Sequence, residues 1–483
     1  MASQAPTATI TKADGVTGNA SITLNIPADI VAQAVTNTYR IYKVFDAVSD
    51  GTSSNISYTS RQGDTLPTGF VLDGQGNIHH GTKDAQTGAI TENTATALTA
   101  EEITSIQNYV RDADLIATVV VPAGVASFTV SDIPYGYYFI DTTTGTVVTV
   151  DSTNPTVTVD DKNTAPSLDK KITGGTDDTI DAAGKAAIAK VGSTVEYTGT
   201  ITVGKGMKNY TYHDKMTSGL QFIPSTLVVT GQKSATDTTA VTVDYTLLTT
   251  PENDDTFTVD FADGLAEGTV IKLVYSAQVT NAALTVNYEK NTAYLDYGRN
   301  PGENKTPESE TKVYAAKITV IKQDGSNQPL AGAKFKLSKS ANEWYKLDTV
   351  DGKPVVTWVA KDSAPEIEAV AVYGDAQDPT KVTSYEAVFQ GLPAGTYTLE
   401  ETTVPQGYNK AADKTFTIKP ATSTDSDVFT VTNLEQTATV INNAGNELPS
   451  TGGIGTTIFY VIGAVLVLGA AAVIIARRKA EQN

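Results

Sequence analysis

The sequence has no cysteine in its 483 residues. Proteins that work outside the cell often gain stability from disulfides, and that chemistry is excluded here. Positive charge is also scarce, since 35 Lys and Arg stand against 54 Asp and Glu and give a net charge of −19. Such a chain repels the phosphates of nucleic acid, which excludes nucleic-acid binding. The composition suits a solvated surface protein whose covalent reinforcement, if any, uses other side chains.

Catalytic patterns are missing as well. The only histidines are His79, His80 and His213. The adjacent pair lies in a Gly- and Asn-rich stretch that we predict to be a loop, where both rings cannot face one site. Ser–His–Asp triads, zinc spacings and Gly-rich phosphate loops do not occur, and "VLDGQGN" has turn residues without the ligand spacing of a calcium loop. We therefore expect no turnover enzyme and no cofactor; the sequence locates no metal site, and a calcium site elsewhere in the chain stays an open alternative.

Long helical periodicity is almost absent, whereas Thr and Val recur in short alternating runs broken by Gly, Asp and Asn. This pattern is typical of all-β sandwiches. One helix is predicted after a capping box from Thr99 to Glu102, with Ile103, Ile106 and Val110 on one face. The length exceeds a single core, and we expect three β domains at 1–163, 164–312 and 313–440.

Only one long apolar run occurs, and it lies near the C-terminus at 454–476. It carries no charge and is longer than the ~20 residues that a bilayer requires. Arg477, Arg478 and Lys479 follow at once, so the positive-inside rule places the 477–483 tail in the cytoplasm and the preceding chain outside. The chain begins without a basic and apolar leader, so we expect that a signal peptide either has been removed or lies outside this chain.

A short motif precedes this span, within a C-terminal segment that we assign to 441–483. The motif reads "LPSTG" at 448–452. It matches the LPxTG sorting signal of Gram-positive surface proteins, including the apolar span and basic tail that follow the signal. The resemblance implies that a sortase cleaves between Thr451 and Gly452 and passes the Thr451 carbonyl to an amine. The matching residues are Leu448, Pro449, Ser450, Thr451 and Gly452.

The third domain carries a second family pattern. It begins "ITVIKQDGSNQPLAGAKFKL", and "YTLEETTVPQGY" at 397–408 matches the YxLxETxAPxGY E-box of Gram-positive pilins, with Val404 where Ala is usual. The domain resembles CnaB-like immunoglobulin-type domains. With the sorting signal, the whole chain resembles a sortase-assembled major, or backbone, pilin. The implied fold is all-β, with tandem immunoglobulin-like sandwiches of CnaA and CnaB type and a C-terminal transmembrane helix.

Domains of this family contain internal Lys–Asn isopeptide bonds promoted by an Asp or Glu, which is autocatalytic chemistry of a single turnover. The amine must be neutral to attack, and burial favours the neutral form. The acid must relay protons. All three side chains should therefore share the face of a strand that carries core residues.

Strand parity selects one set of residues in each domain. In the third domain Lys322 shares parity with Ile318 and Val320, and Glu401 and Asn433 also fall on core-facing positions. The second domain gives Lys170, Asp214 and Asn291. The first gives Lys43, Asp141 and Asn163, a weaker set because aspartate is short and some family members lack this bond. Buried Lys–acid ion pairs are the alternative explanation, although such pairs are costly.

The junction "VTVDDKNTAP" holds a candidate joint between subunits. Alternation sends Asn163 inward and Lys162 outward. In backbone pilins the acceptor lysine lies at this junction in a motif ending YPKN, although Asp160 and Asp161 replace Tyr-Pro here. The resemblance therefore implies that Thr451 of one subunit is joined to Lys162 of the next.

The expected function is the structural shaft subunit of a pilus attached covalently to the cell wall, with a precursor that is transiently in the membrane. Implied partners are pilin-class and housekeeping sortases, copies of the same chain, minor or tip pilins and peptidoglycan. Host surface or matrix molecules are a further partner class, and no residue pattern identifies one. A monomeric wall-anchored adhesin with the same bonds and sorting signal is the alternative, although no large binding domain is visible.

Overall fold

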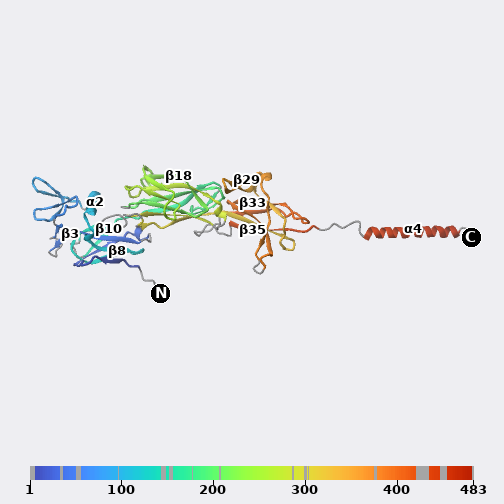
Figure 1. Cartoon of the computed structure of the whole chain (residues 1–483), viewed down its shortest axis with the longest axis horizontal. Coiled ribbons are helices and arrows are strands. Elements are labelled where there is room, and N and C mark those ends of the chain that lie inside the picture. Colours follow the sequence, from blue (N-terminus) through green and yellow to red (C-terminus); the bar gives the residue numbers. More distant parts are fainter. Residues whose placement is uncertain are drawn as a thin grey trace.

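Three β modules follow one another along the long axis of the molecule, and a helix extends beyond them at the C-terminal end (Figure 1). The computed structural model describes residues 6–32, 36–49, 56–61, 63–95, 97–142, 148–151, 156–176, 178–205, 208–284, 288–298, 302, 304–374, 378–419, 434–445 and 454–480. We call the groups of strands β1–β12, β13–β25 and β26–β35 the N-terminal, middle and C-terminal modules. The all-β fold class is thereby confirmed.

The N-terminal module is a sandwich with an added subdomain. A six-stranded sheet in the order β1-β8-β3-β10-β11, with β4 on β3, faces the three-stranded sheet β12-β2-β9, and β5-β6-β7 forms a small separate sheet. Its elements are β1 (Thr9–Lys12), β2 (Ala20–Asn25), α1 (Ala28–Ala32), β3 (Asn37–Ser49), β4 (Ile56–Thr59), β5 (Phe70–Leu72), β6 (Ile78–Lys83), β7 (Ile90–Glu92), α2 (Ala100–Tyr109), η1 (Asp112–Asp114), β8 (Leu115–Val121), β9 (Ser127–Ile133), β10 (Gly136–Thr142), β11 (Val148–Asp151) and β12 (Thr156–Asp160).

The predicted helix is confirmed as α2, and its capping box is complete. The Thr99 hydroxyl accepts the Glu102 N–H at 3.2 Å, and the Glu102 carboxylate accepts the Thr99 N–H at 2.7 Å. Ile106 on this helix is fully buried in a second hydrophobic cluster with Phe45, Ile78 and Phe139. The helix and the small sheet thus cover the outer face of the β3–β10 pair, which is buried on both sides.

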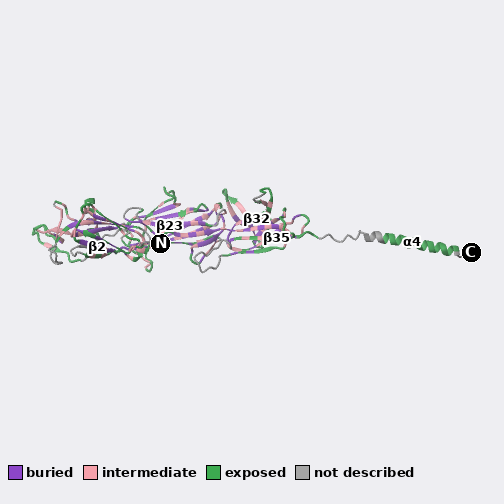
Figure 2. Ribbon diagram, turned by 90° about the horizontal axis from the view of Figure 1, so that it is seen from below, coloured by how far each residue is buried: buried purple, intermediate pink, exposed green. Residues whose placement is uncertain are grey.

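The middle module packs a five-stranded sheet, β13-β16-β22-β18-β19, against an eight-stranded sheet, β14-β15-β25-β23-β17-β21-β20 with β24 on β23. Burial alternates strictly along β16, and also along β23, which is labelled in Figure 2, as a half-buried strand requires. Its elements are β13 (Ser167–Gly175), β14 (Asp178–Ile180), β15 (Ala186–Ala189), β16 (Thr194–Thr202), β17 (Thr211–Met216), β18 (Leu220–Gln232), β19 (Ala240–Val241), β20 (Tyr245–Leu248), β21 (Phe257–Phe261), β22 (Val270–Val279), η2 (Asn281–Leu284), β23 (Glu289–Tyr297), β24 (Asn304–Lys305) and β25 (Ser309–Tyr314).

The C-terminal module packs the sheet β31-β32-β26-β35 against the sheet β29-β28-β27-β33-β34, with β30 on β27. The chain passes from β25 of the middle module directly into β26, so β25 continues to Tyr314, beyond the predicted domain end at 312. The elements of this module are β26 (Ala316–Asp324), β27 (Lys334–Ser340), β28 (Glu343–Val350), β29 (Lys353–Val359), η3 (Lys361–Ser363), β30 (Ile367–Glu368), β31 (Val370–Tyr373), β32 (Val382–Leu392), β33 (Gly395–Thr403), β34 (Lys414–Ile418) and β35 (Glu435–Asn442).

Backbone hydrogen bonds join the middle and C-terminal modules. The Val191 N–H donates to the Gly391 carbonyl at 3.1 Å, and the Val356 N–H donates to the Val191 carbonyl at 3.0 Å. Val191 is buried, so this loop of the middle module is inserted between strands of its neighbour. The Val191 N–H and carbonyl group are both hydrogen-bonded in a buried position, and moving the modules apart would leave them unpaired. The contact therefore favours a stiff arrangement of these two modules.

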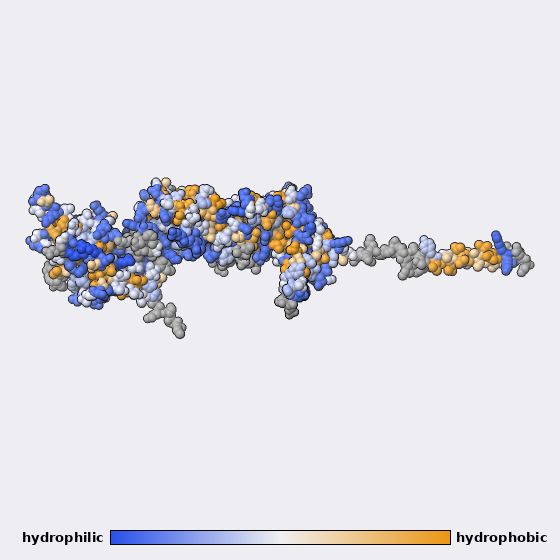
Figure 3. Space-filling view, in the orientation of Figure 1, coloured by the Kyte–Doolittle hydropathy of each residue, from blue (hydrophilic) through white to orange (hydrophobic). Residues whose placement is uncertain are grey.

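The C-terminal helix α4 (Ile454–Ala480) stands apart from the sandwiches. Within the described residues, one helix is long and apolar enough to cross a membrane, at Phe459–Lys479. Figure 3 shows its hydrophobic surface ending in hydrophilic residues at the basic tail. The helix includes the predicted 454–476 span and continues into that tail.

Candidate crosslink sites and the intermodule lysine

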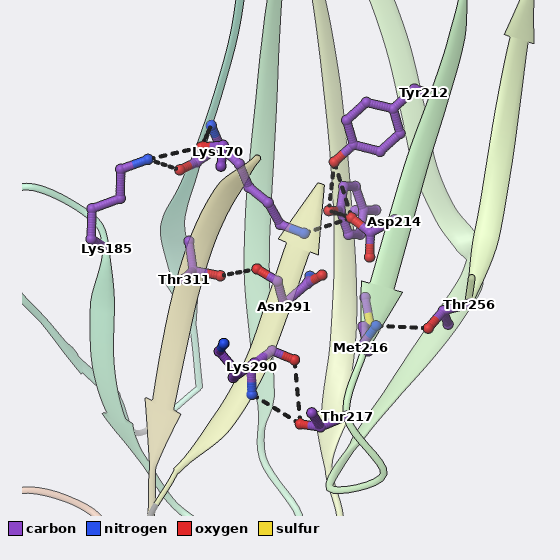
Figure 4. A network of polar contacts seen from close by, with 12 residues as sticks. Lys170, Lys185, Tyr212, Asp214, Met216, Thr217, Thr256, Lys290, Asn291 and Thr311 are labelled. Atoms are coloured by element: carbon purple, nitrogen blue, oxygen red, sulfur yellow. Dashed lines mark hydrogen bonds and ion pairs between the residues drawn. The ribbon is translucent and has the colours of Figure 1, made fainter. Parts of the chain in front are cut away.

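The predicted set of the middle module converges in its core (Figure 4). Lys170 comes from β13, Asp214 from β17 and Asn291 from β23, and each is 0% exposed. β17 and β23 are neighbours in which Asp214 pairs with Ala293 and Met216 with Asn291. Asp214 and Asn291 therefore lie diagonally on the same inward face, as the parity argument required.

The amine and the acid of this site are in direct contact. Lys170 Nζ donates to Asp214 Oδ2 at 2.6 Å, and the same oxygen accepts the Tyr212 hydroxyl at 3.0 Å and the Tyr275 hydroxyl. Asp214 Oδ1 has no hydrogen-bond partner among the described residues. The carboxylate is thus fixed on one oxygen while the other remains available to a third group.

Aromatic rings surround the Lys170 amine. Its Nζ lies 5.2 Å from the centre of the Tyr197 ring and 5.6 Å from that of Tyr275. Burial in this water-excluded pocket lowers the pKa of Lys170 to about 8, even though the Asp214 carboxylate acts in the opposite direction. A substantial fraction of neutral, nucleophilic amine is therefore present near physiological pH.

A glycine makes room for this arrangement. Gly199 pairs with Lys170 across β13 and β16. A Cβ at Gly199 would lie 3.2 Å from the Tyr212 ring, closer than ordinary van der Waals contact. The absence of a side chain at this position thus allows the ring whose hydroxyl holds Asp214 to pack tightly.

The side-chain amide of Asn291 is fully buried, and its oxygen and nitrogen have no well-formed hydrogen bond in the described part of the chain, although the Tyr197 hydroxyl lies close enough to interact with it. Leaving a buried polar group unpaired costs about 1–3 kcal/mol. Native structures keep few such groups, and each requires an explanation. Unpaired amide atoms beside a buried amine and a buried acid are the arrangement expected of the reactants of an amide exchange.

The C-terminal module contains a second set with one change of residue. Lys322 on β26 is fully buried, Glu401 on β33 is nearly so, and burial lowers the pKa of Lys322. The predicted Asn433 lies outside the described residues. Another asparagine occupies the site: Asn442 at the end of β35 is 0% exposed, and its Nδ2 donates to Glu401 Oε2 at 2.8 Å.

The strand register supports Asn442 as the partner of Lys322. β26 and β35 run parallel, with Lys322 beside Val440 and Asp324 beside Asn442. Lys322 and Asn442 are therefore diagonal neighbours on one face. Asn442 Oδ1 and Glu401 Oε1 have no hydrogen-bond partner among the described residues. The sequence signal was present, since Val440 and Asn442 share parity, but the polar stretch "INNAGNE" favours a linker, and the predicted domain therefore ended at residue 440.

The predicted set of the N-terminal module is not brought together, and this prediction is corrected. Lys43 is partly exposed and forms an ion pair with Asp46 at 2.6 Å. Asn163 is buried elsewhere, where its Nδ2 donates to Thr142 Oγ1 at 3.3 Å. Asp141, next to Thr142 on β10, has the opposite parity and so belongs to the other face of its sheet.

Burial on both sides of the β3–β10 pair explains this error. Tyr138 and Ile140 of β10 belong to the main core, whereas Phe139 belongs to the second cluster under α2. The pairing of β10 with β3 also shifts between Tyr137 and Tyr138, where Tyr137 opposes Phe45 and Tyr138 opposes Lys43. A bulge reverses parity along a strand, so Phe45 faces the second cluster although Tyr39 and Ile41, at the same sequence parity, face the main core.

The junction of the first two modules presents Lys162 to solvent and buries Asn163. Hydrogen bonds from both modules hold the residues that follow. The Ala165 N–H donates to Asp29 Oδ2 at 2.8 Å, and the Lys205 N–H donates to Thr164 Oγ1 at 2.7 Å. Lys162 is thus an exposed amine on a constrained segment.

The aspartates before Lys162 bond to the N-terminal module. Asn25 donates to Asp160 at 2.8 Å, and the Tyr39 hydroxyl donates to Asp161 at 3.0 Å. Asp161 is buried, and burial raises the pKa of its carboxyl group. These contacts stabilise the end of the strand from which Lys162 projects.

The histidines are paired with acids. His79 and His80 lie on strand β6 rather than in the predicted loop, and they contact different carboxylates, Glu92 at 2.6 Å and Glu102 at 2.9 Å. His213 stacks on Tyr294 and contacts Asp255 at 2.7 Å. Across the described residues no cluster of three or more His, Cys, Asp or Glu could hold a metal ion.

The predicted sorting-signal residues Leu448, Pro449, Ser450, Thr451 and Gly452 lie outside the described residues. Comparison with family models covers this segment: residues 441–482 match the LPXTG cell wall anchor motif, and residues 316–434 match the SpaA prealbumin-like fold domain. A search of curated proteins by sequence returned no match.

Several solved structures with similar folds are pilins. The T6 backbone pilin of serotype M6 Streptococcus pyogenes, which has a modular three-domain structure, matches with a TM-score of 0.50 and 16% identity over 89% of this chain and 100% of that chain. The Corynebacterium diphtheriae major pilin SpaA gives 0.48 and 16% over 88% and 100%. The group B streptococcus pilus 2b backbone protein gives 0.42 and 25% over 57% and 100%.

These findings define a class of protein. The chain is a cell-wall-anchored surface protein built from β modules, of which the C-terminal one is a SpaA-type prealbumin-like domain. Its overall fold is that of three-domain Gram-positive backbone pilins. The predicted LPXTG anchor and surface location are confirmed.

Proposed function

We propose that this protein is the shaft subunit of a covalent surface pilus. The observation that carries the proposal is the exposed Lys162 on a constrained junction, in a row of β modules that ends in a wall anchor. A pilin-class sortase cleaves between Thr451 and Gly452 and joins Thr451 to Lys162 of another copy. A housekeeping sortase joins the finished fibre to peptidoglycan, and minor or tip pilins complete it.

The transfer conserves the number of amide bonds. The sortase breaks the Thr451–Gly452 peptide bond and holds the Thr451 acyl group. The neutral amine of Lys162 in a second copy attacks that acyl carbon, which forms an amide and releases the enzyme. Exposure matters because the bulky acyl-enzyme must reach the amine, and constraint of the junction reduces the entropy lost when the amine is positioned.

We also propose internal bonds from Lys170 to Asn291 and from Lys322 to Asn442. The neutral lysine amine attacks the asparagine Cγ, a C–N bond forms, the Cγ–Nδ2 bond breaks and ammonia leaves. Asp214 or Glu401 carries a proton from the amine to the departing nitrogen. Support comes from the 2.6 Å contact of Lys170 with Asp214 and from the contact of Asn442 with Glu401.

Mass spectrometry of wall-released fibres tests the function. Digestion should release a branched peptide in which the Thr451 carboxyl group is bonded to Lys162 Nζ. The alternative, a monomeric wall-anchored adhesin, predicts Thr451 bonded only to peptidoglycan. Fibres whose branched peptide contained a different lysine would contradict the assignment of Lys162.

A paired substitution tests which asparagine reacts in the C-terminal module. After correction for the substitution itself, the intact mass of Asn442→Ala should exceed that of the wild type by one ammonia. The ammonia is retained because Lys322 then lacks an electrophile. Asn433→Ala is the matched control and should leave the number of lost ammonia molecules unchanged. The opposite pattern would restore Asn433 as the partner.

The pH dependence of stability tests the environment of Lys170 in an Asn291→Ala variant, where no bond can form. The folded pKa of Lys170 is lowered to about 8, whereas the unfolded value is about 10.4. Between these values the unfolded chain holds the additional proton, so raising the pH favours the folded state.

We expect the free energy of unfolding of the middle module to rise by about 1.5 kcal/mol from pH 8 to 9.5 in this variant. Calorimetric transitions of the full chain at several pH values measure the change. The wild type is the control, since an amide nitrogen at Lys170 does not titrate. If the free energy of unfolding depended on pH equally in the variant and the wild type, the lowered pKa of Lys170 in the variant would be contradicted.

A further inference from the structure

The N-terminal and C-terminal modules share one framework. The three-stranded path β12-β2-β9 corresponds to β35-β26-β32, with the same parallel and antiparallel pairings. A tyrosine anchor recurs on the opposite sheet: the Tyr138 hydroxyl donates to the Pro134 carbonyl, and the Tyr397 hydroxyl donates to the Pro393 carbonyl at 2.7 Å. The two modules can therefore be compared residue by residue.

The antiparallel registers agree pair by pair, and they place Ile26 where the C-terminal module has Lys322. Ile26 follows Ala20 by the same number of residues as Lys322 follows Ala316. The matching pairs are Ala20–Ile133 with Ala316–Leu392, Ile22–Val130 with Ile318–Phe389, and Leu24–Phe128 with Val320–Ala387.

The parallel registers align the two asparagines. β12 pairs with β2 from Ser21 and Thr156, and β35 pairs with β26 from Lys317 and Glu435. Asn163 follows Thr156 by the same number of residues as Asn442 follows Glu435. The parallel register therefore places Asn163 in the position of Asn442. This equivalence uses backbone pairing alone and is independent of any side-chain contact.

Side-chain contacts agree with the alignment. Asn442 Nδ2 donates to Glu401 at 2.8 Å, and Asn163 Nδ2 donates to Thr142 at 3.3 Å. Thr142 follows Pro134 by the same number of residues as Glu401 follows Pro393. The N-terminal module thus keeps the asparagine of the site and has threonine in place of the acid and isoleucine in place of the lysine.

We infer that Asn163 marks a crosslink site in which Ile26 and Thr142 have replaced the lysine and the acid, and that Ile26→Lys with Thr142→Glu makes the N-terminal module self-crosslinking. In the native chain Asn163 remains an ordinary amide. This inference rests on the proposed Lys322–Asn442 bond. It adds that the N-terminal module carries no bond at its equivalent site.

The site has the burial that the reaction needs, since Ile26 is 7%, Thr142 2% and Asn163 1% exposed. An amine introduced at position 26 attacks Asn163 Cγ, the new C–N bond forms, the Cγ–Nδ2 bond breaks and ammonia leaves. The carboxyl group introduced at position 142 moves a proton from the amine to the leaving nitrogen. Asp161, which the parallel register places beside Ile26, offsets the buried positive charge before reaction.

Intact mass and peptide mapping of the full chain test the inference. The variant Ile26→Lys/Thr142→Glu should lose one more ammonia than the wild type and yield a branched peptide that joins position 26 to Asn163. Adding Asn163→Ala should abolish both signals. A folded double variant whose mass shows only the wild-type number of bonds would overturn the inference.

Wild-type protein gives a result that does not depend on the folding of any variant. Its digest should contain Asn163 in an unbranched peptide and Asn442 in a branched one. A branched wild-type peptide at Asn163 overturns this inference. Absence of the Lys322–Asn442 branch instead overturns the proposed bond on which the inference rests, so the two failures are distinguishable.

Discussion

Cells that produce Lys162→Ala are expected to lose the high-mass covalent ladders of this protein and to retain only wall-linked monomer. The alanine removes the amine that accepts the Thr451 acyl group, and the sortase intermediate then reacts only with peptidoglycan amines. Immunoblots of cell-wall extracts measure the effect. Because the reaction needs a nucleophile at one position, the expected loss of polymer is complete.

Two variants test the specificity of this result. Lys171→Ala removes a nearby lysine whose side chain is half exposed, and it should leave the ladders intact. Lys162→Arg keeps the positive charge but supplies a guanidinium that stays protonated, so it should abolish polymer as alanine does. Ladders that persist in Lys162→Ala would assign the joint to another lysine.

Replacement of Lys170 with methionine is expected to have the largest effect on stability. The change removes the proposed bond and leaves the buried Asp214 without the hydrogen-bond donor at position 170. Leaving a buried polar group without its partner costs about 1–3 kcal/mol. A crosslink across a loop of about 100 residues contributes about 4.7 kcal/mol when it is treated like a disulfide.

These terms together correspond to a fall of about 10–30 °C in the melting temperature of the middle module, at about 2–4 °C per kcal/mol. Calorimetry of the full chain gives this value, and intact mass should show one ammonia retained. Lys171→Met, at the exposed neighbouring position, should change stability by no more than about 0.5 kcal/mol. A Lys170→Met protein with the same number of ammonia losses as wild type would refute the Lys170–Asn291 bond.

The middle module shows where strand parity succeeds as a guide. Lys170 and Asn291 lie on strands with one buried and one more exposed face, so alternation identified their inward side chains; Asp214 lies on β17, where the neighbouring His213 is buried as well. Their proximity required more, namely that β13, β17 and β23 enclose one core. The identity of the neighbouring strands came from the resemblance and from the structure rather than from periodicity.

The N-terminal module shows where the same argument fails. β10 is buried on both faces because α2 and the small sheet cover it, so both parities look like core. Asp141 was selected from one face although Asn163 contacts Thr142 on the other. In the C-terminal module Asn442 was missed because a polar "INNAGNE" segment reads as a linker, whereas β35 continues through Asn442.

The amino-acid sequence alone determined the β class, the wall anchor and the outward Lys162 beside the inward Asn163, because each depends on local composition or on the two-residue period of a strand. Tertiary structure decided which strands adjoin, which face meets which core, and hence that Asn442 lies beside Glu401 and that Ile26 occupies the position of the lysine. Those relations depend on hydrogen-bonded register between segments far apart in the chain, and side-chain periodicity does not encode that register.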